Sequence, residues 1–505
     1  MVRFKPGTQS EPKSFVLPAN SASRSTTWLK GLFAPVDNSF LVCFRIGFGA
    51  ILLWHVWTYF SADLIRPHYV DPQIHFTWYG FDWIRPWTAK WMYLHFYVLG
   101  VSAACMLLGF YFRLASFVFA VGFTYVFLID QCWYQNHYYL VCLLSLLCIF
   151  LPAQRALSLD AWRRPTLRSD IAPRWSLHLL RVQIGIPYFF GGLAKINGDW
   201  LHGQPMGIWL TSQSEFPRIG RFLTQAWCAY LFSYGGMLFD LLVVPLLLWR
   251  CSRWITLLVV IGFHLLNASL FNIGYFPWLM LLATALVFVP PEQIAKLRLW
   301  RRNKTVADEA TDADQRLAAW QRWSVAALTL YAIVQTVVPL RYLLYPGNPD
   351  WTSEASYFAW RMKLHNQRFH ISFRAVNPVT GKSSTEDGRY LLTRVQEYKL
   401  THPDMILQLC HALSRDLTSD PERPVEIYVD AKLALNDRPL LTFIDSNVNL
   451  AAECRTLGHA QWIVPLEVAE SKNVHPPSPP QPPRRRAGRP APIGIFEDVH
   501  VGRSL

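Results

Sequence analysis

Charged side chains are scarce in this chain. Only 16% of its 505 residues are Asp, Glu, Lys or Arg, whereas a soluble domain carries about 25%. Hydrophobic residues make up 52%, and the 22 tryptophans are the number expected where aromatic belts mark several membrane interfaces. The composition therefore predicts a membrane protein. The net charge of +14 does not indicate nucleic-acid binding, because the arginines cluster between apolar runs and in the C-terminal tail.

Metal-binding and redox motifs are also lacking. The nine cysteines show no C-x-x-C spacing and no zinc pattern, and most lie in apolar runs, where cysteine acts as a small hydrophobe. The spacing of His137, His202 and His264 matches no metal motif, so no metal site is predicted. Cys410 and Cys454 could pair only if their region faces an oxidising compartment.

The first 28 residues contain no apolar core and do not form a signal peptide, so the first apolar run is expected to act as the targeting segment. Spanning a bilayer as a helix takes about 20 apolar residues, fewer where the helix is enclosed by others. Nine runs come close to this: 39–60, 91–112, 115–130, 137–153, 176–195, 225–249, 254–271, 275–290 and 322–344. They predict an all-α polytopic membrane domain with about nine transmembrane helices.

Basic residues predict the orientation of this domain. Arginine and lysine concentrate at Arg113 and in 154–175, 250–253 and 291–321, which are alternate connections. The positive-inside rule then places the N-terminus inside and the chain after about residue 345 outside. The expected divisions are a partly disordered cytoplasmic segment at 1–34 and a transmembrane domain at 35–345.

The outer part of the chain changes character. HISFRAVNPVTGKSS alternates apolar and polar residues around a Pro/Gly turn, as in a hairpin, and HPDMILQLCHALSRDL has helical spacing after a proline. VEIYVDAKLALNDRPLLTFIDSNVNLA predicts two further strands around Asn436–Pro439. We expect a small extracytoplasmic α+β domain at 346–470, followed by a Pro/Arg-rich disordered tail at 471–505.

Three apolar runs carry polar or aromatic residues at their predicted outer ends. They are Trp133, Asn136 and His137, then Lys195, Asp199 and Trp200, and then His264 and Asn267. If the predicted topology holds, all of these residues lie at the same side of the membrane.

Lys195 is open to two interpretations. A lysine at a helix end usually extends its ammonium to the headgroups, yet ionisable residues within a membrane are candidates for function. Burial against apolar side chains such as Phe189, Phe190 and Leu193 would favour the neutral amine that a base requires. Asp240, within a later apolar run, is also open to two interpretations: a part in the mechanism, or a pair with a neighbouring arginine.

Several stretches together resemble the vitamin K-dependent gamma-glutamyl carboxylase family. They include WYQNHYYLVCLL, YFFGGLAKINGDWLHGQPM and FHLLNASLFNIGYF in the membrane part, and FAWRMKLH, HPDMILQ, IYVDAKLALNDRP and TFIDSNVNLA in the outer part. The likeness extends over roughly residues 35–470, in order and at the same separations. In that family the active-site lysine lies in a motif that matches Ala194-Lys195-Ile196-x-x-Asp199-Trp200, and an essential histidine lies in one that matches Trp133-x-x-Asn136-His137.

The resemblance implies a catalytic reaction. Lys195 would deprotonate vitamin K hydroquinone, which reacts with dioxygen. The strong base so formed removes a proton from the γ-carbon of a glutamyl residue, and carbon dioxide traps the carbanion. The products are gamma-carboxyglutamate and vitamin K epoxide. His137 would assist the carboxylation. The residues expected to bind quinone or substrate are Trp133, Asn136, Asp199, Trp200, His264 and Asn267.

Two alternatives remain open. The animal enzymes continue well beyond the equivalent of residue 470, so a quinone epoxidase of this fold that does not carboxylate protein is one of them. A transporter with Lys195 and Asp240 in its path is less favoured, because the sequence contains no inverted repeats. The expected partners are membrane lipid, an isoprenoid quinone and a glutamate-containing protein or peptide, with no nucleic acid. The excess of arginine over lysine favours a bacterial inner membrane; in a eukaryote the resemblance implies the endoplasmic reticulum membrane.

Overall fold

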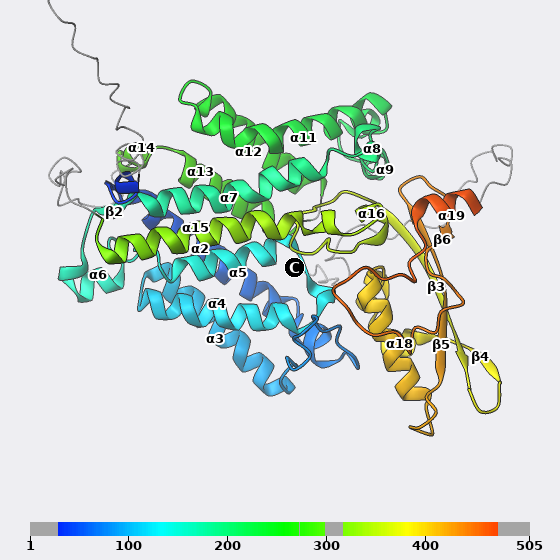
Figure 1. Cartoon of the computed structure of the whole chain (residues 1–505). Coiled ribbons are helices and arrows are strands. Elements are labelled where there is room, and N and C mark those ends of the chain that lie inside the picture. The colour runs from blue at the N-terminus through cyan, green and yellow to red at the C-terminus, as the bar shows by residue number, and fades with distance from the viewer. Residues whose placement is uncertain (1–28, 272, 298–316, 473–505) are drawn as a thin grey trace, which may run out of the picture.

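The computed structural model describes residues 29–271, 273–297 and 317–472 of the chain, and Figure 1 shows them as two parts. A bundle of long helices forms one part. A smaller unit that contains the sheet β4-β3-β5-β6 lies beyond one end of the bundle. The predicted tail at 471–505 lies almost wholly outside the described residues, as does most of the segment at 1–34.

Each of the nine predicted apolar runs forms a helix. The helices are α2 (Ser39–Ser61), α3 (Ala89–Leu108), α4 (Phe112–Ile129), α5 (Asn136–Cys148), α7 (Arg174–Ala194), α11 (Ala226–Leu248), α12 (Arg253–Leu270), α13 (Phe276–Phe288) and α15 (Ala319–Leu340). Only six of them, α2, α3, α4, α11, α12 and α15, are long and apolar enough to cross a membrane by length and composition. The predicted count of nine spans is therefore not confirmed. The helices α5 and α13 have 13 residues each, and α7 carries several polar side chains.

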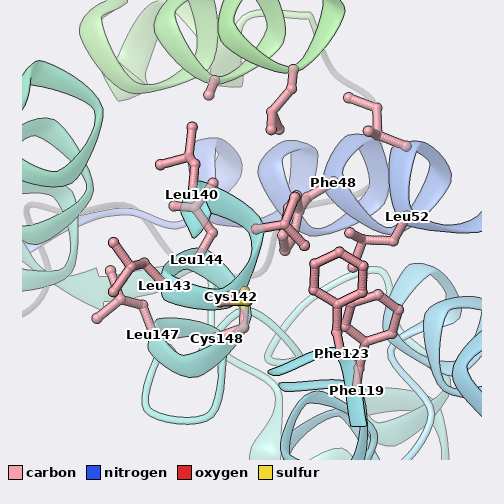
Figure 2. Packing of buried hydrophobic residues seen from close by; sticks show 14 of the residues in the cluster. Phe48, Leu52, Phe119, Phe123, Leu140, Cys142, Leu143, Leu144, Leu147 and Cys148 are labelled. Carbon is pink, nitrogen blue, oxygen red and sulfur yellow. The ribbon is translucent and has the colours of Figure 1, made fainter. Parts of the chain in front are cut away.

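The helices α2 to α5 pack in chain order, as do α11 to α13; α13 also contacts α2, and α7 contacts α11, α13 and α15. Phe48 and Leu52 of α2, Phe119 and Phe123 of α4, and Leu144 of α5 meet in the core (Figure 2). The outer faces of α12 and α15 are mostly exposed apolar side chains, which is the surface that lipid requires. The bundle thus has a packed interior and an apolar exterior.

The C-terminal unit, which we call the outer unit because it lies beyond one end of the bundle, has the predicted α+β structure. The hairpin is β3 (Gln367–Val376) with β4 (Ser383–Glu386), and the later pair is β5 (Glu426–Leu435) with the short β6 (Leu441–Thr442). All neighbours in the sheet are antiparallel. Apolar residues of β3 and β5 pack against the amphipathic helix α18 (Pro403–Leu417), which begins at the predicted proline. Cys410 is buried inside this core while Cys454 is exposed, and both are free thiols, so the disulfide considered for them does not form.

Charged residues join the two parts. Arg455 binds Asp404 of α18 with Nε–Oδ1 at 2.9 Å, and it also binds Thr77 and Asp82 in the loop between α2 and α3. Gln131, two residues after the end of α4, donates to Asp404 at 2.6 Å. The outer unit is therefore fixed to the ends of the membrane helices.

This contact predicts a pH dependence of stability. Burial opposes ionisation of Asp404, but the hydrogen bond and charge of Arg455 outweigh it, so the pKa of Asp404 lies below its usual range. The stabilisation is then fully present above about pH 4, the unfolded value, and is lost as the pH falls through the lowered folded pKa. Asp404→Asn should lower the free energy of unfolding by roughly 2 kcal/mol at pH 7. Thermal unfolding of the purified protein measures this.

The exposed Asp430 of β5 provides the matched control, since Asp430→Asn removes a carboxylate from the same unit without touching this contact. The difference between wild type and Asp404→Asn should shrink as the pH is lowered towards 3. A difference that stays constant across that range contradicts the assignment.

Candidate active site

A cavity of about 2180 Å³ lies where the helix bundle meets the outer unit. Six of the eight predicted site residues line it: Asn136, His137, Lys195, Trp200, His264 and Asn267. Trp133 and Asp199 are not part of the lining. The outer unit contributes a large part of the wall, including β3 and the helix α17 (Arg394–Lys399). The sequence separations between these elements are large, so only the fold brings them together.

Lys195 points inward. It follows the last residue of α7, and its side chain turns back along the helix, where Nζ donates to Gly191 O at 3.1 Å and to Asp240 Oδ2 at 2.5 Å. The residue is only 8% exposed, and Nζ lies 5.3 Å from the centre of the Trp200 ring. An anchor lysine would extend to the headgroups instead. The geometry is that of a buried amine in an ion pair.

Asp240 is the acidic partner, and the interpretation that it pairs with an arginine is wrong. It lies on α11, which packs closely against α7 because Gly192 has no side chain. A Cβ at Gly192 would lie 2.9 Å from the backbone nitrogen of Leu241, so any larger residue would push the helices apart. The expected apolar wall also differs, since Phe189 is 52% exposed and faces away from the packed interior. A carboxylate, a carbonyl and an indole face surround the amine.

A second polar group lies on the same wall. His264 Nε2 and Tyr188 Oη are 2.7 Å apart, and Tyr188 Oη is 3.0 Å from Thr284 Oγ1. Asn267, expected to act with His264, donates instead to Phe263 O within its own helix. Tyr188 was missed in the sequence because an aromatic residue in an apolar run is normally a packing residue. Its position seven residues before Lys195, on the same helical face, was the available signal.

His137 lies at the start of α5 in an aromatic surround. Its ring centre is 4.8 Å from that of Tyr138, 5.0 Å from that of Tyr275 and 5.6 Å from that of Phe276. Its ring nitrogens make no hydrogen bond to the part of the chain that the structure describes, and the residue borders the cavity. They are free to bind a ligand there.

Trp133 and Asn136, which precede His137 in the same motif, both bind other parts of the protein. Trp133 donates from Nε1 to His68 O at 3.1 Å and stacks on the His68 ring at 3.5 Å. Asn136 accepts from Tyr134 Oη at 3.0 Å and donates to Arg361 O at 3.5 Å. The motif that carries His137 is thus also bound to the outer unit.

The loop after Lys195 is also bound by the outer unit. Asp199 forms hydrogen-bonded ion pairs with Arg438 at 2.7 and 3.0 Å and accepts from Asn436 Nδ2 at 2.6 Å. These two partners belong to the turn between β5 and β6. Trp200, fully buried, donates from Nε1 to Ser233 O on α11. Asp199 therefore positions the lysine loop from behind the cavity wall.

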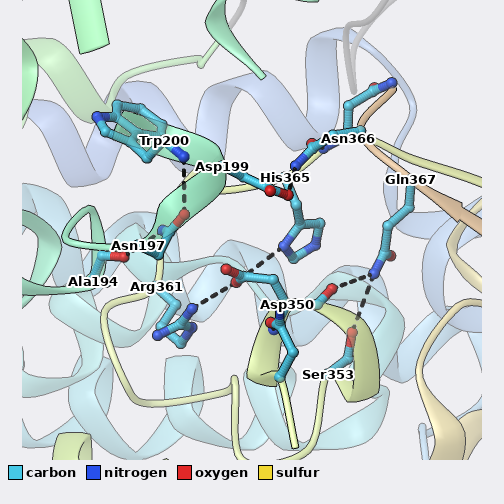
Figure 3. Close-up of polar contacts among 12 residues, drawn as sticks. Ala194, Asn197, Asp199, Trp200, Asp350, Ser353, Arg361, His365, Asn366 and Gln367 are labelled. Atoms are coloured by element: carbon cyan, nitrogen blue, oxygen red, sulfur yellow. Dashed lines mark hydrogen bonds and ion pairs between the residues drawn. The ribbon is translucent and has the colours of Figure 1, made fainter. Parts of the chain in front are cut away.

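A cluster in the outer unit was not predicted. Arg361 Nη2 binds Asp350 Oδ1 at 2.6 Å, and His365 Nδ1 is 3.4 Å from the same oxygen (Figure 3). Burial opposes ionisation of Asp350, but the hydrogen bond of His365 and the charge of Arg361 prevail and lower its pKa. Arg361 and His365 both line the cavity. The available signal was the density of basic residues in FAWRMKLH.

Among the described residues, no three His, Cys, Asp or Glu side chains are grouped closely enough to hold a metal ion. The cavity instead combines an apolar region between helices with a basic region at the outer unit. The lining residues Pro187, Leu231, Phe232, Phe263 and Phe271 belong to the apolar region. This arrangement suits a hydrophobic molecule that reacts beside a polar one.

Comparison with known families agrees with this two-part architecture. A model of the HTTM domain matches residues 33–292, which is just over half of the chain. A model of the lumenal domain of vitamin K-dependent gamma-carboxylase matches residues 320–469, the outer unit together with α15. No solved structure matches the chain. Both matches occur in one chain, in the order of the helix bundle and the outer unit. The chain is a membrane protein of the vitamin K-dependent gamma-carboxylase family.

Proposed function

We propose that this protein couples oxygenation of a vitamin K hydroquinone to carboxylation of glutamyl residues. The observation that carries the proposal is the buried Lys195 amine, turned inward onto Asp240 in a cavity that also holds His137. An ionisable pair kept away from water at the end of a membrane helix indicates function more than anchoring. The family match supports the same reaction class.

The size and lining of the cavity support two substrates. Pockets for one small ligand enclose about 300–1,000 Å³, so a cavity of about 2180 Å³ has room for a quinone and a peptide side chain. The apolar walls between the helices fit an isoprenoid quinone. The quinone supplies the oxygen chemistry, with dioxygen and carbon dioxide as the other reactants.

The residues have separate tasks in this proposal. In the structure, Lys195 donates a hydrogen bond to Asp240. For Lys195 to act as a base, this pair must first lose one proton. The neutral amine can then accept a proton from the hydroquinone. The Trp200 face and the Gly191 carbonyl hold the amine in place meanwhile. His137, with unoccupied ring nitrogens, stabilises charge or carries a proton at the carboxylation step.

The proposed orientation has the outer unit outside the cell or in a lumen, with the basic connections inside. Two exposed native cysteines test it: Cys251 between α11 and α12, and Cys454 in the outer unit. A membrane-impermeant thiol reagent should label Cys454 in intact bacterial cells and Cys251 only after permeabilisation. Cys251→Ser and Cys454→Ser identify each signal. Labelling of both cysteines in intact cells contradicts the orientation.

Replacement of Lys195 by arginine tests the base role. Arginine keeps the positive charge and reaches Asp240, but its pKa above about 12 prevents it from serving as a neutral base. Lys195→Arg should therefore insert and fold normally yet lose epoxide formation by roughly 100-fold or more. The assay uses purified protein with reduced vitamin K, dioxygen, labelled bicarbonate and a glutamyl peptide, and follows both products.

Lys90, an exposed lysine at the start of α3, provides the matched control. Lys90→Arg should leave both products unchanged. Epoxide formation near the wild-type level in Lys195→Arg would reject the base role. Epoxide without carboxyglutamate in the wild type would reduce the proposal to a quinone epoxidase.

Truncation of His137 should separate the two products. If His137 acts after oxygenation, His137→Ala should lower carboxyglutamate by about 10-fold or more relative to epoxide, because the carbanion step loses its stabilising group. His411, on α18 outside the cavity, is the control, and His411→Ala should change neither product. A parallel fall of both products in His137→Ala would place the residue in the oxygenation step or in the fold.

A further inference from the structure

Strand β3 has one edge that is only partly paired. All ten residues from Gln367 to Val376 pair with β5 on one side. On the other side, β4 pairs only with Phe373–Val376. The chain then turns away after Glu386 into a short helical turn at Gly388–Leu391, so β4 does not continue along β3. Residues Gln367–Ser372 thus present a free strand edge.

The register shows which peptide groups face this edge. In an antiparallel ladder, alternate residues direct their N–H and C=O groups to opposite sides. Asn436 N donates to Asn366 O, so the even-numbered residues of β3 bond to β5. Asn377 N donates to Lys382 O, so the odd-numbered residues face the side of β4. The N–H and C=O groups of Gln367, Phe369 and Ile371 therefore face the free edge.

These groups lack partners and border the cavity. Within the described ranges, no hydrogen bond reaches the backbone of Gln367, Phe369 or Ile371 from the free side. All three residues line the same cavity as Lys195 and His137. Backbone polar groups are nearly always paired in native structures, so a row of them along a cavity indicates a ligand or water there.

Two lysines at this cavity form no ion pair with an acidic side chain of the described residues. Lys363, just before β3, extends its amine over the rings of Trp209 and Phe271 at 5.4 and 5.5 Å. Lys399, at the end of α17, donates to Cys132 O at 2.7 Å and lies over the Trp133 ring. Neither makes an ion pair with the residues the structure describes; Lys363 is exposed and Lys399 is half-buried. Burial lowers the pKa of Lys399 although the charge of Asp130 opposes this effect, and a ligand carboxylate would be a favourable partner for both ammonium groups.

The spacing of the unpaired N–H and C=O groups along β3 indicates which kind of ligand fits this edge. Groups that face one edge recur about every 6.6 Å along a strand, with a donor and an acceptor at each step. An isoprenoid chain offers nothing to bond them. An extended peptide matches them along its whole length, as in strand addition to an exposed sheet edge. The outer unit contributes six Lys or Arg residues and three Asp or Glu residues to the cavity lining, and this excess of positive charge favours an acidic sequence.

We propose that an extended acidic peptide binds along the free edge of β3 at Gln367–Ser372, as an additional strand in line with β4, with its carboxylates near Lys363 and Lys399. This inference rests on the proposed function and deepens it, because it assigns the way in which the glutamyl substrate is held. Backbone bonding would position the peptide with little dependence on its sequence, while the lysines select for acidic side chains. The strand would run beside the cavity that contains Lys195.

The test is binding of synthetic peptides to the full-length protein in nanodiscs, measured by fluorescence anisotropy. The probe is a labelled eight-residue peptide with glutamate at alternate positions and valine between them. This pattern fixes the register, because a slip by one residue would turn every glutamate to the other face. Two N-methylated forms are compared, one methylated at all glutamates and one at all valines.

Strand addition requires that only one of the two forms binds like the unmodified peptide, whereas the other binds roughly tenfold or more weakly, because it loses the N–H groups that face β3. Equal binding of both forms overturns the proposal. So does equal binding of a peptide in which glutamine replaces glutamate.

Protein variants locate the site. Lys363→Gln should weaken binding of the acidic peptide by roughly fivefold or more, and this loss should vanish in high salt. Lys382, exposed in the turn between β3 and β4, is the matched control, and Lys382→Gln should bind as the wild type does. Equal effects of the two substitutions overturn the assignment of Lys363.

The peptide-binding experiment and the activity assay test the two proposals separately. Anisotropy needs neither quinone nor dioxygen, so the expected binding pattern in a protein that forms no epoxide would reject the proposed function and leave the peptide site in place. Epoxide and carboxyglutamate formed without the expected binding pattern would reject the peptide site alone.

Discussion

The ion pair between Lys195 and Asp240 sets the main constraint on this structure. A charged amine enclosed among the helices of a membrane protein is costly unless a carboxylate and hydrogen-bond acceptors surround it. Asp240 and the Gly191 carbonyl meet that need, and they do so only because α7 and α11 approach closely at Gly192. Gly192 therefore determines both how closely the two helices pack and whether Asp240 can reach the Lys195 amine.

The outer unit also helps to position Lys195 and His137. The loop that begins at Lys195 continues to Asp199, which Arg438 and Asn436 bind from the turn after β5. The segment that carries His137 is bound through Asn136 to Arg361 O. Both predicted catalytic elements thus depend on the same outer unit for their position. That unit is a structural component of the site as well as part of its wall.

The sequence predicts the helices, the strands and the family well, because these follow from hydrophobic periodicity and from motifs shared in order. It predicts poorly which side chains meet. An arginine partner was one of the two interpretations of Asp240, whereas the fold supplies Lys195. The Arg361–Asp350 pair and the free edge of β3 depend on tertiary placement and on where a neighbouring strand ends. Neither leaves a periodic signal in the chain.

The helix α7 shows why the expected number of spans is not confirmed. Hydropathy identifies helices that face lipid, yet α7 packs against α11, α13 and α15 and has little need of a lipid-compatible surface. Its polar residues, including Gln183 and Tyr188, bond inward to neighbouring helices. An enclosed helix tolerates such residues, and a reaction that moves protons requires them. The helix α7, which hydropathy does not identify as a span, is therefore the helix that ends next to the candidate base, Lys195.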